Sequence, residues 1–354
     1  MKITAVEPIT VTFDLGREPM SFCFVRVTTD DGRVGYGEAC DSYGCSYASV
    51  LATVITDVFA PLLVGLDLVA VEPLADRLRL FTRRRLGDTW IAAQARSGVE
   101  IALCDLAAQA AGLSVSAMLG QARDRVAVYA SSTFLDEGPA EFHLELITPL
   151  LERGVRMVKV RTGPNWQSDL AKLAELRSMV GDDIELMIDG SETYTLPTAV
   201  EISKRLADLG IRWFEEPIPQ GARAAIKSLC EKSSVPIAYG EHLYGTDDAL
   251  EALANGGVSV LQPDASVSGG IMATRAIAGL ASYYGARVVL HVCAGPISLA
   301  ANLHVAGSVP RSAPSSTRST SSRSGPAWAM RPSAPSTSST ASSRSRPDRA
   351  WGCA

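Results

Sequence analysis

The sequence lacks the marks of a membrane or exported protein. None of its apolar runs approaches the length that spans a bilayer. The opening MKITAVEPITVTFDL alternates apolar and polar residues as a strand does, unlike a signal peptide. The seven cysteines are scattered, and even Cys40 and Cys45 are spaced too loosely for a zinc site. We therefore expect reduced thiols and a cytoplasmic protein.

Positive charge is scarce over most of the chain. The formal net charge is −5, but residues 311–354 hold seven arginines, no lysine and one acid, so residues 1–310 carry −11. An acidic body disfavours nucleic acid as a partner. With no membrane segment either, a small molecule is the expected partner, and local cations would have to bind an anionic one.

Aliphatic residues almost disappear from residue 310 onward. Segment 310–354 is rich in serine, arginine and proline and has no periodicity, so its composition predicts disorder. We interpret it as the product of a frameshifted reading frame, with a natural low-complexity tail as the alternative. The intact mass of the native protein, or resequencing around the codon for Pro310, separates the two.

Residues 1–120 predict an α+β unit. A three-strand meander with a DDG turn occupies about the first 55 residues. The remainder is mostly helical and ends in SGVEIALCDLAAQAAG, whose Gly112 suits a helix C-cap.

Residues 121–309 alternate strands and helices in seven successive units, with the first strand expected over residues 126–132 and the seventh over residues 287–293. This order predicts an α/β fold, a (β/α)₈ TIM-type barrel whose eighth unit is missing, with the active site at the carboxyl ends of the strands. A doubly wound open sheet is the alternative. It is disfavoured because its functional residues would gather at one switch point and not on successive strands.

Three acids end three successive predicted strands. Asp189, Glu215 and Glu241 lie 26 residues apart, about the length of one strand, one helix and two short loops. Three consecutive strands would therefore deliver one carboxylate each to the same place. Oxygen-only ligands suit a hard divalent cation, so we expect a Mg²⁺ site.

Other strand ends carry residues suited to proton transfer. Alternation places Lys159 and Arg161 on one face of the second strand. Asp264 ends the sixth strand and His291 lies on the seventh, so they should be neighbours in a barrel. A carboxylate beside a histidine orients the ring and raises its basicity.

These strand ends, in this order, resemble the enolase superfamily, and within it the mandelate racemase and muconate lactonizing enzyme family. The resemblance covers roughly residues 1–310 and rests on SGVEIALCDLAAQAAG, the K-x-R strand, MIDG, WFEEP, GEH, LQPDASVSGG and HVCAGPISLAANLH. It implies that Asp189, Glu215 and Glu241 bind one Mg²⁺, which chelates a substrate carboxylate. A base would then remove the α-proton to give a stabilised enediolate.

Departures from the family patterns narrow the predicted reaction. QPDASVSGG lacks the lysine of the lactonizing subgroup, so the racemase-like subgroup fits better. Arg161 replaces the second lysine of racemase-type members and cannot readily be deprotonated. A one-base dehydration of a sugar acid, with His291 as the base and with Lys159 and Arg161 as carboxylate clamps, is therefore favoured. A lactone cycloisomerase, a racemase or epimerase, and an inactive remnant remain alternatives.

Substrate contacts and assembly are predicted only coarsely. The resemblance implies that the N-terminal unit caps the barrel and sets specificity. Arg17 and Tyr43 in its loops are candidate substrate contacts, as are Ser191 and His242 beside the metal ligands. We expect Glu216 to be structural, and relatives imply a homo-oligomer.

Overall fold

The structure is a computed structural model that describes residues 1–14, 19–40, 47–292 and 294–309. The predicted contacts Arg17 and Tyr43 and the predicted disordered segment 310–354 lie outside the described residues. Within the described ranges, no helix combines the length and apolarity that crossing a membrane requires.

The N-terminal unit begins with an antiparallel meander, as predicted. Strands β1 (Ile3–Asp14), β2 (Pro19–Thr29) and β3 (Val34–Ala39) pair in that order. Gly32 turns the chain between β2 and β3 with φ 83°, a conformation that costs glycine little. Alternate β2 side chains are buried, so one face of the sheet packs inward.

Helices cover that buried face. They are α1 (Ala48–Val54), a π-helical turn (Ile55–Phe59), α2 (Ala60–Leu63), α3 (Val71–Arg85), α4 (Trp90–Ala111) and α5 (Val115–Met118). Helix α4 ends at Gly112 in the left-handed conformation, the predicted C-cap. It packs directly against β3. The contact is so close that a Cβ atom on Gly37 would stand only 1.8 Å from the Gly98 carbonyl oxygen. The glycine therefore permits this close helix–sheet contact.

Seven parallel strands form the second sheet, in the order of the chain from β4 to β10. They are β4 (Ala130–Phe134), β5 (Met157–Arg161), β6 (Glu185–Asp189), β7 (Phe214–Glu215), β8 (Ile237–Tyr239), β9 (Val260–Leu261) and β10 (Arg287–Val288). Neighbouring strands are consecutive in sequence, which is barrel topology and not the reversed order of a doubly wound sheet. The predicted seven-unit partial barrel is confirmed.

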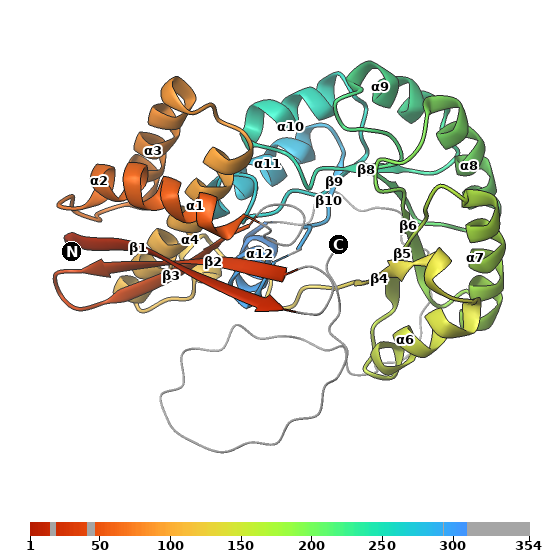
Figure 1. Cartoon of the computed structure of the whole chain (residues 1–354), viewed down its shortest axis with the longest axis horizontal. Helices are drawn as coiled ribbons and strands as arrows, with labels where there is room; N and C mark the ends of the chain where they lie inside the picture. The colour runs from red at the N-terminus through yellow and green to blue at the C-terminus, as the bar shows by residue number, and fades with distance from the viewer. Residues whose placement is uncertain (15–18, 41–46, 293, 310–354) are drawn as a thin grey trace.

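Helices alternate with these strands and lie outside them. They are α6 (Ala140–Glu152), α7 (Trp166–Val180), α8 (Leu196–Asp208), α9 (Arg223–Lys232), α10 (Gly245–Ala254), α11 (Ile271–Tyr283) and α12 (Pro296–Ser308), with a 3₁₀ turn (Leu135–Glu137) before α6. In Figure 1 helices α6 to α11 follow an open arc around the strands, and the N-terminal unit lies at one side.

Some strands are shorter than predicted. The first was expected over residues 126–132 and spans Ala130–Phe134; the seventh was expected over 287–293 and spans Arg287–Val288. Strand β10 pairs with β9 alone in the described part of the chain, so only one side of it is held by a ladder. His291 therefore lies just beyond its strand.

The N-terminal unit shares a hydrophobic core with the barrel. Its main cluster of buried residues includes Ala265 and Ile271 at the start of the α11 unit, and Ala301 and Val305 on α12. Burial of these side chains fixes the N-terminal unit against the last two described barrel units. It thus lies beside the segments after β9 and β10 that carry Asp264 and His291.

Candidate active site

The predicted acids meet at the carboxyl ends of adjacent strands. Asp189 and Glu215 are the last residues of β6 and β7 and are direct register partners. Glu241 follows the end of β8 by two residues. Asp189 and Glu215 are only 5% and 1% exposed. Buried carboxylates require compensating positive charge.

Lys159 supplies part of that charge. Its ammonium donates to Asp189 Oδ2 at 3.0 Å and also contacts Glu215 Oε1. Arg161 Nε donates to the same Asp189 oxygen at 3.2 Å. Burial alone would raise the pKa of Asp189, but Lys159 and then Arg161 outweigh it and lower the pKa to about 2. Asp189 is therefore ionised at neutral pH.

The two cations stay charged for the same reason. Burial disfavours the charged form of Lys159, but Asp189 and Glu215 together raise its pKa well above the usual value. The pKa of Arg161 is likewise raised, because Asp189 overcomes the cost of burial. Neither side chain has the low pKa of a proton acceptor in this arrangement.

Two side chains that donate hydrogen bonds to Glu215 were not predicted from the sequence. Trp213 Nε1 donates to Glu215 Oε2 at 3.1 Å, and Gln262 Nε2 donates to the same oxygen at 2.7 Å. Gln262 follows β9, two strands from Glu215, so no local pattern signals this contact. The two bonds fix the orientation of the carboxylate.

A second acidic group adjoins the first. Ligand atoms of Glu216, Glu241 and His242 all lie within 4.8 Å of one another. Burial, and then the neighbouring acids Asp189 and Glu215, raise the pKa of Glu216 well above its usual value. Burial is also the largest cause that raises the pKa of Glu241, to about 7.

This acidic group fits a divalent cation. Glu216 Oε1 is buried and accepts no hydrogen bond from any described residue, and Glu216 holds a strained positive φ of 36°. Oxygen donors crowded at the cost of mutual repulsion suit Mg²⁺. This group shares Glu241 with the predicted metal ligands. The other two predicted ligands, Asp189 and Glu215, are paired with the Lys159 ammonium instead.

Asp264 and His291 form the predicted pair. His291 Nδ1 lies 3.2 Å from Asp264 Oδ2. Burial opposes ionisation of Asp264, but the hydrogen bond and charge of His291, with help from Asn302 and Ser266, lower its pKa below the usual value. An ionised Asp264 holds the proton of His291 on Nδ1. The other ring nitrogen, Nε2, is 3.1 Å from Glu241 Oε2 and faces the acids.

Two of the predicted substrate contacts, Ser191 and His242, lie in the described residues, and their surroundings differ. Ser191 donates through its backbone N–H to Asp189 Oδ1 at 2.9 Å and so supports the acid. His242 is buried, with its ring centroid 5.5 Å from that of Trp90 at the start of α4. Trp90 was missed in the sequence because only the fold brings the N-terminal unit to the barrel mouth.

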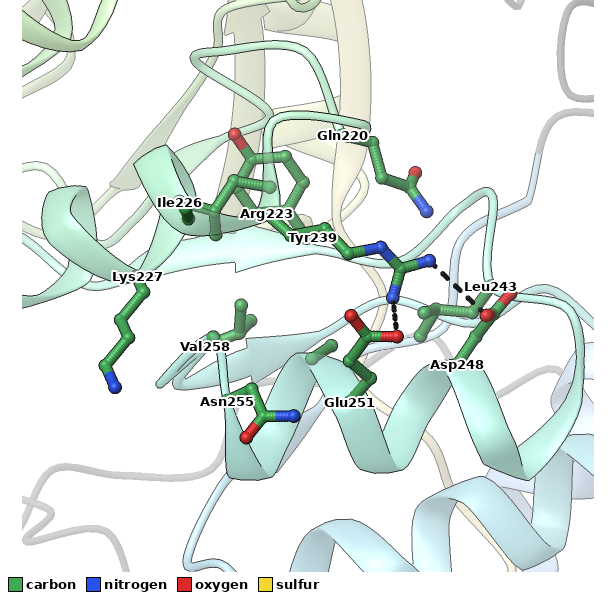
Figure 2. Close-up of a pocket in the computed structure, with 13 residues that line it drawn as sticks. Gln220, Arg223, Ile226, Lys227, Tyr239, Leu243, Asp248, Glu251, Asn255 and Val258 are labelled. Atoms are coloured by element: carbon green, nitrogen blue, oxygen red, sulfur yellow. Dashed lines mark hydrogen bonds and ion pairs between the residues drawn. The ribbon is translucent and has the colours of Figure 1, made fainter.

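One hollow in the described part of the chain lies away from these residues. It has a volume of about 220 Å³ and opens between α9 and α10, outside β8. Figure 2 shows Arg223 across it, paired with Asp248 and Glu251. None of the predicted site residues lines it. It is a gap in the helical layer and not the active site.

Comparison with known proteins accounts for this arrangement. The family model described as "Mandelate racemase / muconate lactonizing enzyme, N-terminal domain" matches residues 2–120, and that described as "Enolase C-terminal domain-like" matches residues 144–330. The chain belongs to the mandelate racemase/muconate lactonizing enzyme family of the enolase superfamily. The N-terminal unit is thus the capping domain of this family, as predicted.

Named relatives of this family member are hydro-lyases and an isomerase. Arabinonate dehydratase of Saccharolobus solfataricus is 32% identical over 83% of this chain and 79% of its own length. D-galactarolactone cycloisomerase of Agrobacterium fabrum is 31% identical over 86% of this chain and 82% of its own length. A family protein of Paracoccus denitrificans PD1222, solved in complex with magnesium, has a TM-score of 0.78 and 28% identity, covering 87% of this chain and 83% of that one.

Proposed function

We propose that this chain is a Mg²⁺-dependent dehydratase of a sugar acid. The observation that carries the proposal is the one-sided placement of the base. His291 faces the acids with a partner that keeps Nε2 able to accept a proton, whereas Arg161 stands where a second base would be needed. One base suffices for elimination but not for two-base racemisation.

Asp189, Glu215 and Glu241 would hold the metal, with Glu216 and His242 adjoining them. When bound, Mg²⁺ would offset the negative charge that develops on the substrate carboxylate as the α-proton leaves. Lys159 and Arg161 would bind the same carboxylate through their N–H groups. Their raised pKa values keep them positively charged for this task.

His291 would remove the α-proton through Nε2, and Asp264 would stabilise the imidazolium that forms. The β-carbon–oxygen bond then breaks, and the departing hydroxyl takes a proton from the imidazolium or another acid and leaves as water. The resulting enol converts to a 2-keto-3-deoxy acid. One proton and one hydroxyl leave the substrate, so the step balances as loss of water.

Incubation with a sugar-acid library tests the proposal. We expect a Mg²⁺-dependent 2-keto product that reacts with semicarbazide, and EDTA should remove the activity while added Mg²⁺ restores it. Failure of the folded protein to act on any library member would instead support an inactive remnant.

A lactone cycloisomerase is the second candidate, because a relative 31% identical carries that activity. It too needs a single base, and His291 supplies one. Lactones in the same library separate the reactions: a cycloisomerase converts a lactone into a product of the same mass, whereas a dehydratase converts an open-chain acid into a product that is lighter by one water. Mass spectrometry distinguishes the two. Exchange of the α-proton in D₂O would occur with either reaction, so it tests the base and not the product. We further propose a cytoplasmic, homo-oligomeric protein, which fractionation and light scattering would test.

A further inference from the structure

Glu38 is a fully buried carboxylate of the capping domain that reaches into the barrel. It lies near the end of β3 and is 0% exposed. Its Oε1 accepts from Gly295 N at 2.6 Å, and its Oε2 accepts from Ser298 N at 3.0 Å. Gly295 is the N-cap residue of α12 and Ser298 lies in its first turn, so the helix itself offers neither N–H group a partner. Glu38 therefore caps a helix of the other domain.

Helix α12 in turn holds Asp264. Asn302 Nδ2 donates to Asp264 Oδ1 at 2.9 Å, and Asn302 Oδ1 accepts from Ala265 N at 2.9 Å. Ser298 Oγ lies 3.0 Å from Ser266 Oγ, which donates to Asp264 Oδ1 at 2.7 Å. A continuous set of hydrogen bonds thus runs from Glu38 through α12 to the carboxylate that orients His291.

We propose that Glu38 is a positioning residue that sets the geometry of the Asp264–His291 pair from the capping domain. The inference rests on the proposed function and adds a role for the cap that does not involve contact with substrate. Glu38 lies directly against the start of α12, where a Cβ atom on Gly295 would stand 2.7 Å from Glu38 Oε1. A small displacement of α12 would move Asn302 and Ser298 together and misalign the acceptor of the His291 proton.

Glu100 provides a matched control. This buried carboxylate on α4 caps α11 in the same way, accepting from Ile271 N at 2.7 Å and from Met272 N at 2.9 Å. Among the described residues, the side chains that hydrogen-bond the Asp264 carboxylate belong to Ser266, His291 and Asn302, none of which lies on α11. Replacing either glutamate removes a helix cap at the interface between the two domains. Only replacement of Glu38 should change the geometry of Asp264 and His291.

Glu38→Gln and Glu100→Gln should therefore differ in rate. Gln keeps one acceptor oxygen but turns an N–H donor toward the second N–H of the helix. For Glu38→Gln we expect kcat of α-proton exchange to fall about 10- to 100-fold while KM stays within about threefold. Faster hydrogen–deuterium exchange at residues 295–302 should accompany it. Glu100→Gln should keep kcat within about threefold and speed exchange at the start of α11 instead.

A double-mutant cycle with Asn302→Ala decides whether the effect passes through α12. If it does, Glu38→Gln should cost less than about threefold in kcat when Asn302 is already absent, whereas Glu100→Gln should combine additively with Asn302→Ala. Additive losses for Glu38 and Asn302, or equal losses for the two glutamates, would overturn the inference. Absence of exchange in the unsubstituted protein would overturn the proposed function instead, while the hydrogen–deuterium exchange result would still report the Glu38 contact.

Discussion

At the scale of single residues, neighbouring carboxylates of the site differ in pKa because their surroundings differ. Asp189 keeps a low pKa because Lys159 and Arg161 contact it, whereas burial is the largest cause that raises the pKa values of Glu216 and Glu241. One site thus holds ionised and proton-binding carboxylates side by side. A divalent cation would remove this imbalance, which explains why the acids are tolerated in a buried position.

The role of His291 gives the clearest prediction at this scale. His291→Asn should lower α-proton exchange in D₂O by about 100- to 10,000-fold, because the amide cannot accept the proton. Asp264→Asn should lower it by a similar factor, since its amide would favour the wrong tautomer of the ring. Exchange is followed by NMR of recovered substrate.

His143→Asn serves as the control for that experiment. His143 is a buried histidine on α6 whose Nε2 lies 3.4 Å from the Leu135 carbonyl oxygen, away from the acids. Its replacement should leave exchange per folded molecule unchanged. Exchange at the normal rate by His291→Asn would reassign the base.

The spacing of the sequence predicted a residue of the site only where that residue ends a strand. Asp189 and Glu215 could be found because equal spacing reports the length of a β/α unit, and the structure places them as register partners. Gln262 and Glu38 could not, because their contacts depend on how distant strands and domains pack. The roles of the site residues remain predictions for the experiments above.

At the scale of elements, two helices of the barrel begin on carboxylates of the capping domain. Glu38 caps α12 and Glu100 caps α11, and the N–H groups at a helix start favour negative charge. The sequence predicted both the capping unit and the barrel helices, but nothing local in β3 or α4 indicates which helix each acid meets. Strand β10 is shorter than the sequence predicted because, among the described residues, it pairs with β9 alone, and this pairing cannot be predicted from its own residues.

Burial of Glu100 predicts a pH dependence of stability. Burial, the largest cause, raises its pKa to about 7 against 4.5 ordinarily, although Met272 N and Ile271 N oppose the shift. The folded state therefore holds the proton more tightly than the unfolded state. This contribution to the free energy of unfolding is fully present below pH 4.5 and is lost as pH rises through about 7.

The loss should amount to about 3 kcal/mol, since each pKa unit corresponds to about 1.4 kcal/mol. In urea unfolding between pH 4.5 and 8, the free energy of unfolding should fall by about 3 kcal/mol more in the unsubstituted protein than in Glu100→Gln, because the raised pKa values of Glu216 and Glu241 contribute to both curves. Glu72→Gln, an exposed acid on α3, is the control and should follow the unsubstituted protein. Parallel pH curves for Glu100→Gln and the unsubstituted protein would contradict the assignment.

At the scale of the whole molecule, the sheet follows barrel order but has two ends. Within the described ranges β4 pairs only with β5, and β10 only with β9. Closed barrels of this type have eight strands, and an open edge leaves backbone groups and apolar side chains uncovered. The sequence predicted this shortfall from composition alone, because segment 310–354 lacks the aliphatic residues of a buried strand.

Supplying an eighth unit should therefore stabilise the molecule. We predict that replacing residues 311–354 with the C-terminal barrel segment of a complete family member raises Tm by about 5 °C or more. A strand that buries three apolar side chains contributes about 5 kcal/mol before its ordering entropy is subtracted, which is enough for such a shift. Calorimetry measures it, and deletion of 311–354 is the control, which should leave Tm unchanged because its composition adds no core. If deletion lowers Tm as much as the replacement raises it, residues 311–354 themselves complete the fold and the reading of this segment as disordered is wrong.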